Sequence, residues 1–196
     1  MKPAWLARLS PTWRARMVRL GFNFHPAFRG TGGRVVHVAR DLRHIRIALP
    51  CSWKTKNIVG SLYGGSLFAI TDGAHPMMLM AALGEAYVVW DKSASIRYRK
   101  PGYTTLYADF SIDEAELACI REQLLRHPEL ERTYTIELKD GHGTVHTVVE
   151  RTVYIAEKNY YRKKSGGDKD ADNTLDPGDL QPRPQPATGL QHGTGT

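Results

Sequence analysis

The stretch that decides the fold reads Asn57-Ile-Val-Gly60-Ser-Leu-Tyr63-Gly64-Gly65-Ser-Leu-Phe-Ala-Ile-Thr-Asp72-Gly-Ala-His75-Pro76, within a chain of 196 residues. It opens the longest helical pattern of the sequence, residues 62–83, where apolar residues recur every three or four positions. Pro76 has no N–H to donate to the carbonyl of residue 72, so we expect a kink there. Because this helix is very apolar, we expect the rest of the fold to enclose it.

Two features of this stretch point to chemistry. Gly64 and Gly65 at the helix start let another group approach the backbone closely, and first-turn amides have no partner within the helix. They therefore suit an oxyanion hole, although close packing against a sheet would also explain them. Asp72 lies two turns further on, where a carboxylate must be paired, protonated or used in a reaction.

Around this helix the sequence predicts six strands, connected mainly as hairpins. Asp113 with Glu116 three residues later predicts the start of a second helix, and the turn at residues 140–143 predicts a hairpin. This order favours an α+β fold with a curved, mostly antiparallel sheet around one long central helix. The predicted strands are residues 34–39, 44–49, 88–98, 104–112, 133–138 and 145–156.

The chain divides into three predicted parts. Residues 1–23 form an amphipathic helix whose apolar stripe is Trp5, Leu9, Trp13, Met17 and Leu20. We expect this helix to dock on its own domain, the alternatives being a membrane-surface helix or a targeting peptide. Residues 24–161 form the folded domain. Residues 162–196 are predicted to be disordered, because the chain beyond residue 166 is rich in Gly and Pro and has no aromatic residue.

Composition excludes several classes of protein. The net charge is +7, and residues 1–56 hold twelve Lys and Arg against one acid, Asp41. We interpret this as a solvated basic surface and predict no nucleic-acid partner, because no RNA-recognition or helix-turn-helix pattern occurs. The longest apolar run, residues 77–83, is too short to span a membrane. Cys51 and Cys119 have no metal-ligand spacing, so we expect a reducing, cytoplasmic location and no metal or other cofactor.

The spacing Asn57-x2-Gly60-x3-Gly64-Gly65-x6-Asp72 resembles the active-site segment of hotdog-fold acyl-CoA thioesterases of the phenylacetyl-CoA type. The closer similarity is to an uncharacterised thioesterase-like hotdog family. It continues through Val89-Trp90-Asp91-Lys92-Ser93-Ala94-Ser95-Ile96-Arg97-Tyr98-Arg99-Lys100-Pro101-Gly102 and covers residues 24–156. The resemblance implies the hotdog fold and a homodimer or a dimer of dimers.

The resemblance also implies a role for each matching residue. The amide of Gly64 binds the thioester oxygen with Asn57 beside it, and Asp72 is the general base or the nucleophile. A hydroxyl that places water in some relatives falls near Asp91, with Ser93 or Ser95 as its substitute. Tyr63 stands where the better-known enzymes have histidine; it can donate a hydrogen bond but does not titrate near neutrality. The predicted substrate-binding residues are Tyr63, Gly65, Asp91, Ser93, Ser95, Arg97, Arg99 and Lys100.

Charge and helix geometry add two expectations. Lys54, Lys56, Arg97, Arg99 and Lys100 are candidates for a rim that binds the phosphates of coenzyme A, the alternative being a charged strand end. Positions 64 and 72 of one continuous helix are about 12 Å apart, too far to serve one thioester carbonyl. The spacing therefore predicts a site shared by two protomers.

The leading prediction is a thioesterase of fatty acid metabolism that hydrolyses an acyl-CoA or an acyl carrier protein thioester. Three alternatives stay open. The first is a hotdog protein that binds acyl thioesters without turnover, and the second is a hydratase that uses His75 near Asp72. The third alternative is a basic adaptor that binds a membrane surface or nucleic acid through residues 1–56. No integral membrane association is expected.

Overall fold

The computed structural model describes residues 10–172. Trp5 and Leu9 of the predicted N-terminal stripe lie outside these residues, as does the part of the predicted tail beyond residue 172. Within the described part, no helix has both the length and the apolar character that crossing a membrane requires.

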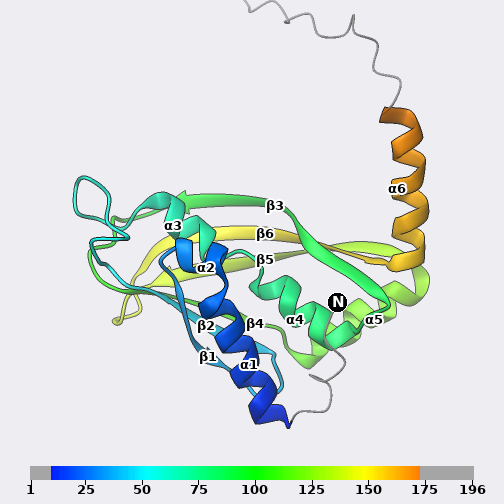
Figure 1. Ribbon diagram of the computed structural model, residues 1–196, viewed down its shortest axis with the longest axis horizontal. Coiled ribbons are helices and arrows are strands. Elements are labelled where there is room, and N and C mark those ends of the chain that lie inside the picture. The colour runs from blue at the N-terminus through cyan, green and yellow to red at the C-terminus, as the bar shows by residue number, and fades with distance from the viewer. Residues whose placement is uncertain (1–9, 173–196) are drawn as a thin grey trace, which may run out of the picture. The chain divides into compact units, whose positions relative to one another are not determined.

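One six-stranded sheet forms the body of the fold, in the order β1-β2-β4-β5-β6-β3 (Figure 1). Every neighbouring pair is antiparallel, which confirms the predicted sheet. Gly143, with φ of 85°, closes the predicted hairpin between the fifth and sixth strands, because this backbone conformation favours glycine. The strands are β1 (Arg34–Val38), β2 (His44–Leu49), β3 (Tyr87–Tyr98), β4 (Leu106–Ser111), β5 (Glu129–Lys139) and β6 (Val145–Glu157).

The central helix is interrupted rather than continuous. It consists of α3 (Gly64–Ala69) and α4 (Ala74–Leu83), so the predicted single helix over residues 62–83 is wrong in this respect. Gly73 supplies the turn with φ of 79°, and the Thr71 hydroxyl donates to the carbonyl of Phe68. Pro76 falls in the first turn of α4, where its missing N–H leaves no helical bond unmade. The break therefore replaces the kink expected beside residue 72.

The core lies between the sheet and this broken helix. Ile70, Met78 and Leu79 are buried against apolar side chains of the strands, and α4 contacts both β3 and β4. At the start of the second predicted helix, Asp113 caps α5 (Glu114–Arg126) by accepting the Glu116 N–H at 2.7 Å, as predicted. The contacts of α4 with β3 and β4 thus enclose the most apolar segment of the chain.

The N-terminal helix docks on the edge of the sheet through a face that the sequence did not indicate. In α1 (Pro11–Phe24), Trp13 and Leu20 of the predicted stripe are 53% and 42% exposed. Phe22 packs on the core instead, and Asn23 forms two hydrogen bonds with the backbone of Val35 on β1. The short helix α2 (Pro26–Gly30) follows and buries Phe28. The predicted docking on the domain is correct, whereas the predicted docking face is wrong.

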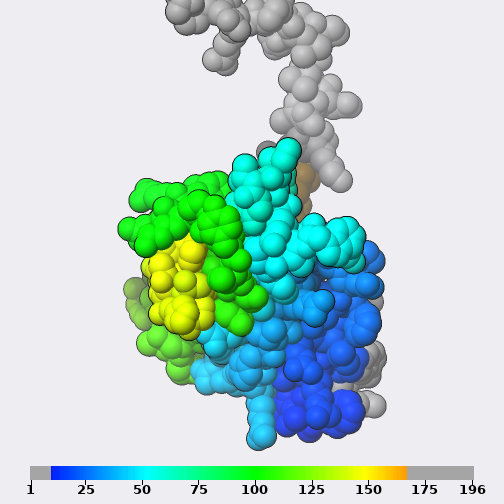
Figure 2. Space-filling view, turned by 90° about the vertical axis from the view of Figure 1, so that its left-hand side faces the viewer, coloured from blue at the N-terminus to red at the C-terminus, as the bar shows by residue number. Residues whose placement is uncertain are grey.

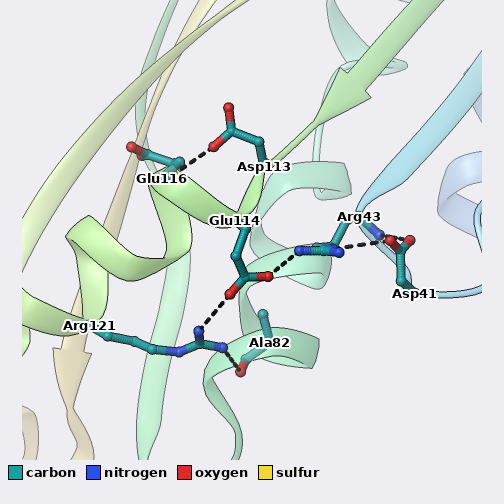
Figure 3. Close-up of polar contacts among 7 residues, drawn as sticks. All are labelled: Asp41, Arg43, Ala82, Asp113, Glu114, Glu116 and Arg121. Carbon is teal, nitrogen blue, oxygen red and sulfur yellow. Dashed lines mark hydrogen bonds and ion pairs between the residues drawn. The ribbon is translucent and has the colours of Figure 1, made fainter.

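Exposed ion pairs connect three elements at one end of the sheet (Figure 3). Arg43, at the start of the second strand, pairs with Asp41 and with Glu114 of α5. Arg121 also pairs with Glu114, and it donates to the carbonyl of Ala82 near the end of α4. Because these groups are largely exposed, each pair stabilises the fold only slightly.

Within the described residues, the chain continues after β6 as a helix. Residues 162–172, which the sequence assigned to the tail, belong to the helix α6 (Lys158–Asp172). Their Lys, Arg, Asp and Ala residues are compatible with a helix despite Gly166 and Gly167. The disorder of the tail stays a prediction.

Candidate active site

The glycine pair begins α3 between two tyrosine rings. The first hydrogen bond of this helix runs from Leu67 N–H to Tyr63 C=O, so the amides of residues 64–66 have no acceptor within the helix. A Cβ on Gly64 would lie 2.9 Å from the Tyr98 hydroxyl, and one on Gly65 would lie 2.4 Å from the Tyr63 ring. Tyr98 also donates to the carbonyl of Gly64 at 3.1 Å. Close approach of the rings explains why glycine stands at both positions.

Asn57 shapes the loop that leads to the glycine pair. Its Oδ1 accepts the N–H groups of Val59 and Ser61, each at 3.1 Å, and its Nδ2 donates to the Ser61 hydroxyl at 2.8 Å. The backbone of Tyr63 is fixed in turn by donating to the carbonyl of Thr55 at 2.8 Å. Asn57 therefore holds the shape of the loop beside Gly64.

A cavity of about 300 Å³ adjoins this loop, and its lining brings several predicted residues together. Asn57 and Gly64 line it from the helix side, while Tyr98, Arg99 and Lys100 line it from the end of β3. Figure 2 views the molecule from this end, where the loop before α3 and the segment after β3 form adjoining surfaces. Two cations thus border the cavity that holds the free helix N-terminus, which suits an anionic or carbonyl-bearing ligand.

Asp72 lies at the break between α3 and α4 and lines a different, mainly apolar cavity of about 470 Å³. Phe22, Ala27 and Phe28 of the two N-terminal helices supply much of its wall, and Ala69 and Gly73 complete it beside the carboxylate. The two cavities share no lining residue. Within one chain, the carboxylate and the glycine amides therefore face separate spaces.

A buried arginine organises the helix break. Arg151 of β6 donates to the Thr71 hydroxyl at 2.9 Å and to the Phe68 carbonyl at 3.2 Å. Its Nη1 lies 3.2 Å from Asp91 Oδ2 and 3.7 Å from Asp72 Oδ1. The sequence analysis did not single out Arg151. Its spacing of two residues from both Val149 and Val153 could have shown that it shares their core-facing side of the strand.

The other predicted substrate-binding residues of β3 lie on two different faces of the strand. A bulge between Asp91 and Ser93 shifts the alternation of β3, so that Ala94 pairs with Arg151 and Tyr98 reaches Gly64. Ser93 and Ser95 alternate with these residues and are exposed, as is Arg97. These three residues line neither cavity. Lys54 and Lys56 are exposed in the loop before α3 and do not line either cavity.

His75, the residue on which a hydratase site would depend, faces the core. It is 3% exposed, stacks on Tyr134 with ring centroids 4.1 Å apart, and meets the edge of Phe110. Burial lowers its pKa to about 4, with a contribution from the Arg151 charge, so the imidazole is neutral near pH 7. This packing is that of a core aromatic side chain.

Substitution of Arg151 by Met is expected to destabilise the fold by about 3 kcal/mol, because it leaves Asp91 buried without its cation. Urea unfolding followed by circular dichroism measures the effect. The matched control is Arg121→Met, which removes a half-exposed ion pair on α5 and is expected to cost less than about 1 kcal/mol. Equal losses for the two variants would contradict a structural role of Arg151 at the helix break.

Comparison with known proteins places the chain in a family. Residues 14–155 match the family model described as "Domain of unknown function (DUF4442)". The chain belongs to this family. No curated protein matches it. The match spans most of the first helix, the broken helix and the sheet as far as residue 155, and therefore both halves of the site in this chain.

Solved structures show the same fold. A Pseudomonas aeruginosa protein of unknown function, described as a probable thioesterase, is 16% identical with a TM-score of 0.64, covering 72% of this chain and 95% of its own. A Haemophilus influenzae thioesterase is 12% identical with a TM-score of 0.55, covering 73% and 90%. The E. coli PaaI protein of the phenylacetic acid degradation operon is 13% identical with a TM-score of 0.51, covering 73% and 91%. The chain has the thioesterase-like hotdog fold that the sequence predicted.

Proposed function

We propose that this protein hydrolyses acyl thioesters at a site shared by two protomers, with Asp72 as the general base. The observation that carries the proposal is that each chain holds two incomplete half-sites in separate cavities. One half presents free amides at Gly64, and the other presents a carboxylate at the mouth of an apolar cavity. The fold similarity to proteins described as thioesterases supports the same chemistry.

The reaction follows from the groups present. Asp72 takes a proton from water while the water oxygen forms a bond to the thioester carbon. The carbonyl oxygen becomes an oxyanion that the Gly64 amide stabilises at the start of α3. The C–S bond then breaks, and the departing thiolate receives the proton from Asp72. The products are a carboxylic acid and a thiol.

An edge strand offers the surface for the second protomer. Within the described sheet, β3 pairs on one side with β6 and forms an outer edge. It is 12 residues long, and residues 93–95 are exposed. A long unpaired edge is a ready template for pairing with a second copy about a two-fold axis. Such pairing brings the helix break of one protomer near the Gly64 loop of the other.

The substrate assignment rests on the two cavities. The apolar cavity beside Asp72 suits an acyl group, and the cations Arg99 and Lys100 at the end of β3 suit an anionic thioester such as acyl-CoA. Acyl-CoA is therefore the substrate class that we propose. A panel of acyl-CoAs, followed by thiol release with a chromogenic reagent, tests this assignment. Absence of turnover with every member would contradict hydrolysis and favour binding alone.

Filling the apolar cavity tests the acyl position. Ala27→Phe adds a ring to its wall on the exposed α2 and is expected to lower kcat/KM for a bulky acyl-CoA about tenfold or more, with acetyl-CoA little affected. The control is Ala115→Phe on the exposed surface of α5, which lines neither cavity. Equal losses for small and bulky acyl groups would place the acyl chain elsewhere.

A further inference from the structure

The base at the helix break has a second carboxyl group beside it. Asp91 Oδ2 accepts the N–H of Gly73 at 3.2 Å and a hydrogen bond from Arg151 Nη1 at 3.2 Å. The same Nη1 lies 3.7 Å from Asp72 Oδ1. A single guanidinium from β6 therefore joins a carboxylate of the helix break to a carboxylate of β3.

The two carboxyl groups differ in their access to solvent. The side chain of Asp72 is 68% exposed, whereas that of Asp91 is 12% exposed. Asp91 Oδ1 is buried, and within residues 10–172 no N–H or O–H group donates to it. Two ionised carboxylates exceed the one positive charge of Arg151, so the pair favours retaining a proton.

We propose that Asp91 is a positioning residue for Asp72, and that the two carboxyl groups hold one proton between them while Arg151 fixes their orientation. The inference rests on the proposed hydrolysis and deepens it, because it names what regulates the base. Asp91 is too buried to meet the substrate and acts through the exposed carboxylate.

The charged groups that face Asp91 come from each neighbouring element. Asp72 and the Gly73 N–H come from the helix break, and Arg151 comes from β6. His75 of α4 is neutral near pH 7 and adds no charge. Burial and a hydrogen bond with Asp72 raise the pKa of Asp91 to about 6, against the opposing effects of the Gly73 N–H and Arg151.

This arrangement predicts a pH dependence with a definite sign. Below pH 6 Asp91 is protonated and neutral, and Asp72 has no negative neighbour. As the pH rises through about 6, Asp91 ionises, and its negative charge then lies beside the proton that passes from water to Asp72. That charge stabilises the proton transfer, so the hydrolysis rate rises through this interval.

Asp91→Asn tests the inference, because the amide keeps the shape of the side chain but never ionises. We expect kcat/KM at pH 7.5 to fall about tenfold and the rise near pH 6 to disappear. The matched control is Asp109→Asn on β4, where an exposed carboxylate pairs with His44 and Arg46. It is expected to keep the wild-type profile. A rise near pH 6 that persists in Asp91→Asn would overturn the proposal.

A second measurement separates this inference from the proposed function. Carbon-13 NMR of the aspartate carboxyl groups follows Asp91 without any substrate. We expect its titration midpoint near pH 6 in the wild type and at a lower pH in Asp72→Asn, which removes the neighbouring carboxylate. A lower midpoint in Asp72→Asn would support the coupling of Asp72 and Asp91 even if the protein hydrolysed no thioester. An unchanged midpoint in Asp72→Asn would overturn the shared proton.

Discussion

Asp72→Asn is expected to lower kcat/KM for thioester hydrolysis by about 10²–10⁴-fold, because it removes the general base while keeping the shape of the side chain. We expect the fold to tolerate this substitution, because the Asp72 carboxylate is mainly exposed and its Oδ1 lies 3.7 Å from Arg151 Nη1. Thiol release measured across pH 5–8 gives the rate.

The affinity for a substrate analogue distinguishes a variant that has lost only the catalytic step from one whose binding site is damaged. Calorimetry with a non-hydrolysable acyl-CoA analogue should give a similar affinity for wild type and Asp72→Asn, because the amide still fits the mouth of the apolar cavity. Asp109→Asn on β4 controls for a change of net charge and should retain full turnover. Undiminished turnover of Asp72→Asn would exclude Asp72 from the mechanism.

Mixed refolding is expected to restore activity to two inactive variants. Asn57→Ala releases the loop that fixes Gly64, and Asp72→Asn removes the base in the other half-site. When the two are unfolded together and refolded, random pairing makes half of the dimers mixed. One site of each mixed dimer then has both intact residues, so about a quarter of all sites recover.

The control is each variant refolded alone, which fixes the background. Recovery of about a quarter of wild-type activity supports a site that joins Asn57 of one protomer to Asp72 of the other. If both residues instead served one chain, every site would keep a defect. Activity no higher than that of the separately refolded parents would contradict the shared site.

The reason for expecting a shared site changed with the structure. The estimate of about 12 Å between positions 64 and 72 assumed a continuous helix. The structure interrupts that helix at Thr71 to Gly73, so the rise per residue no longer measures the separation. The separate cavities of Gly64 and Asp72 now support the same conclusion.

Sequence alone determined the features that depend on short-range pattern. The alternation of Ile45, Ile47 and Leu49 predicted β2, and Asp113 with Glu116 predicted the start of α5, because side-chain direction and helix capping follow from neighbours in the chain. The fold family was implied by the resemblance of the segment from Asn57 to Asp72 to hotdog thioesterases. These residues lie within a single segment.

Tertiary structure decided what depends on groups far apart in the chain. Arg151 reaches Asp91 across 60 positions and Thr71 across 80. The pairing of β3 with β6 brings Arg151 beside Asp91, and the packing of the helix break on the sheet brings it beside Thr71. The docked face of α1 was likewise set by the hydrogen bonds of Asn23 to β1 rather than by its apolar stripe. A helical period shows which residues share a face, but the partner that buries that face is chosen by packing and hydrogen bonding across the whole fold.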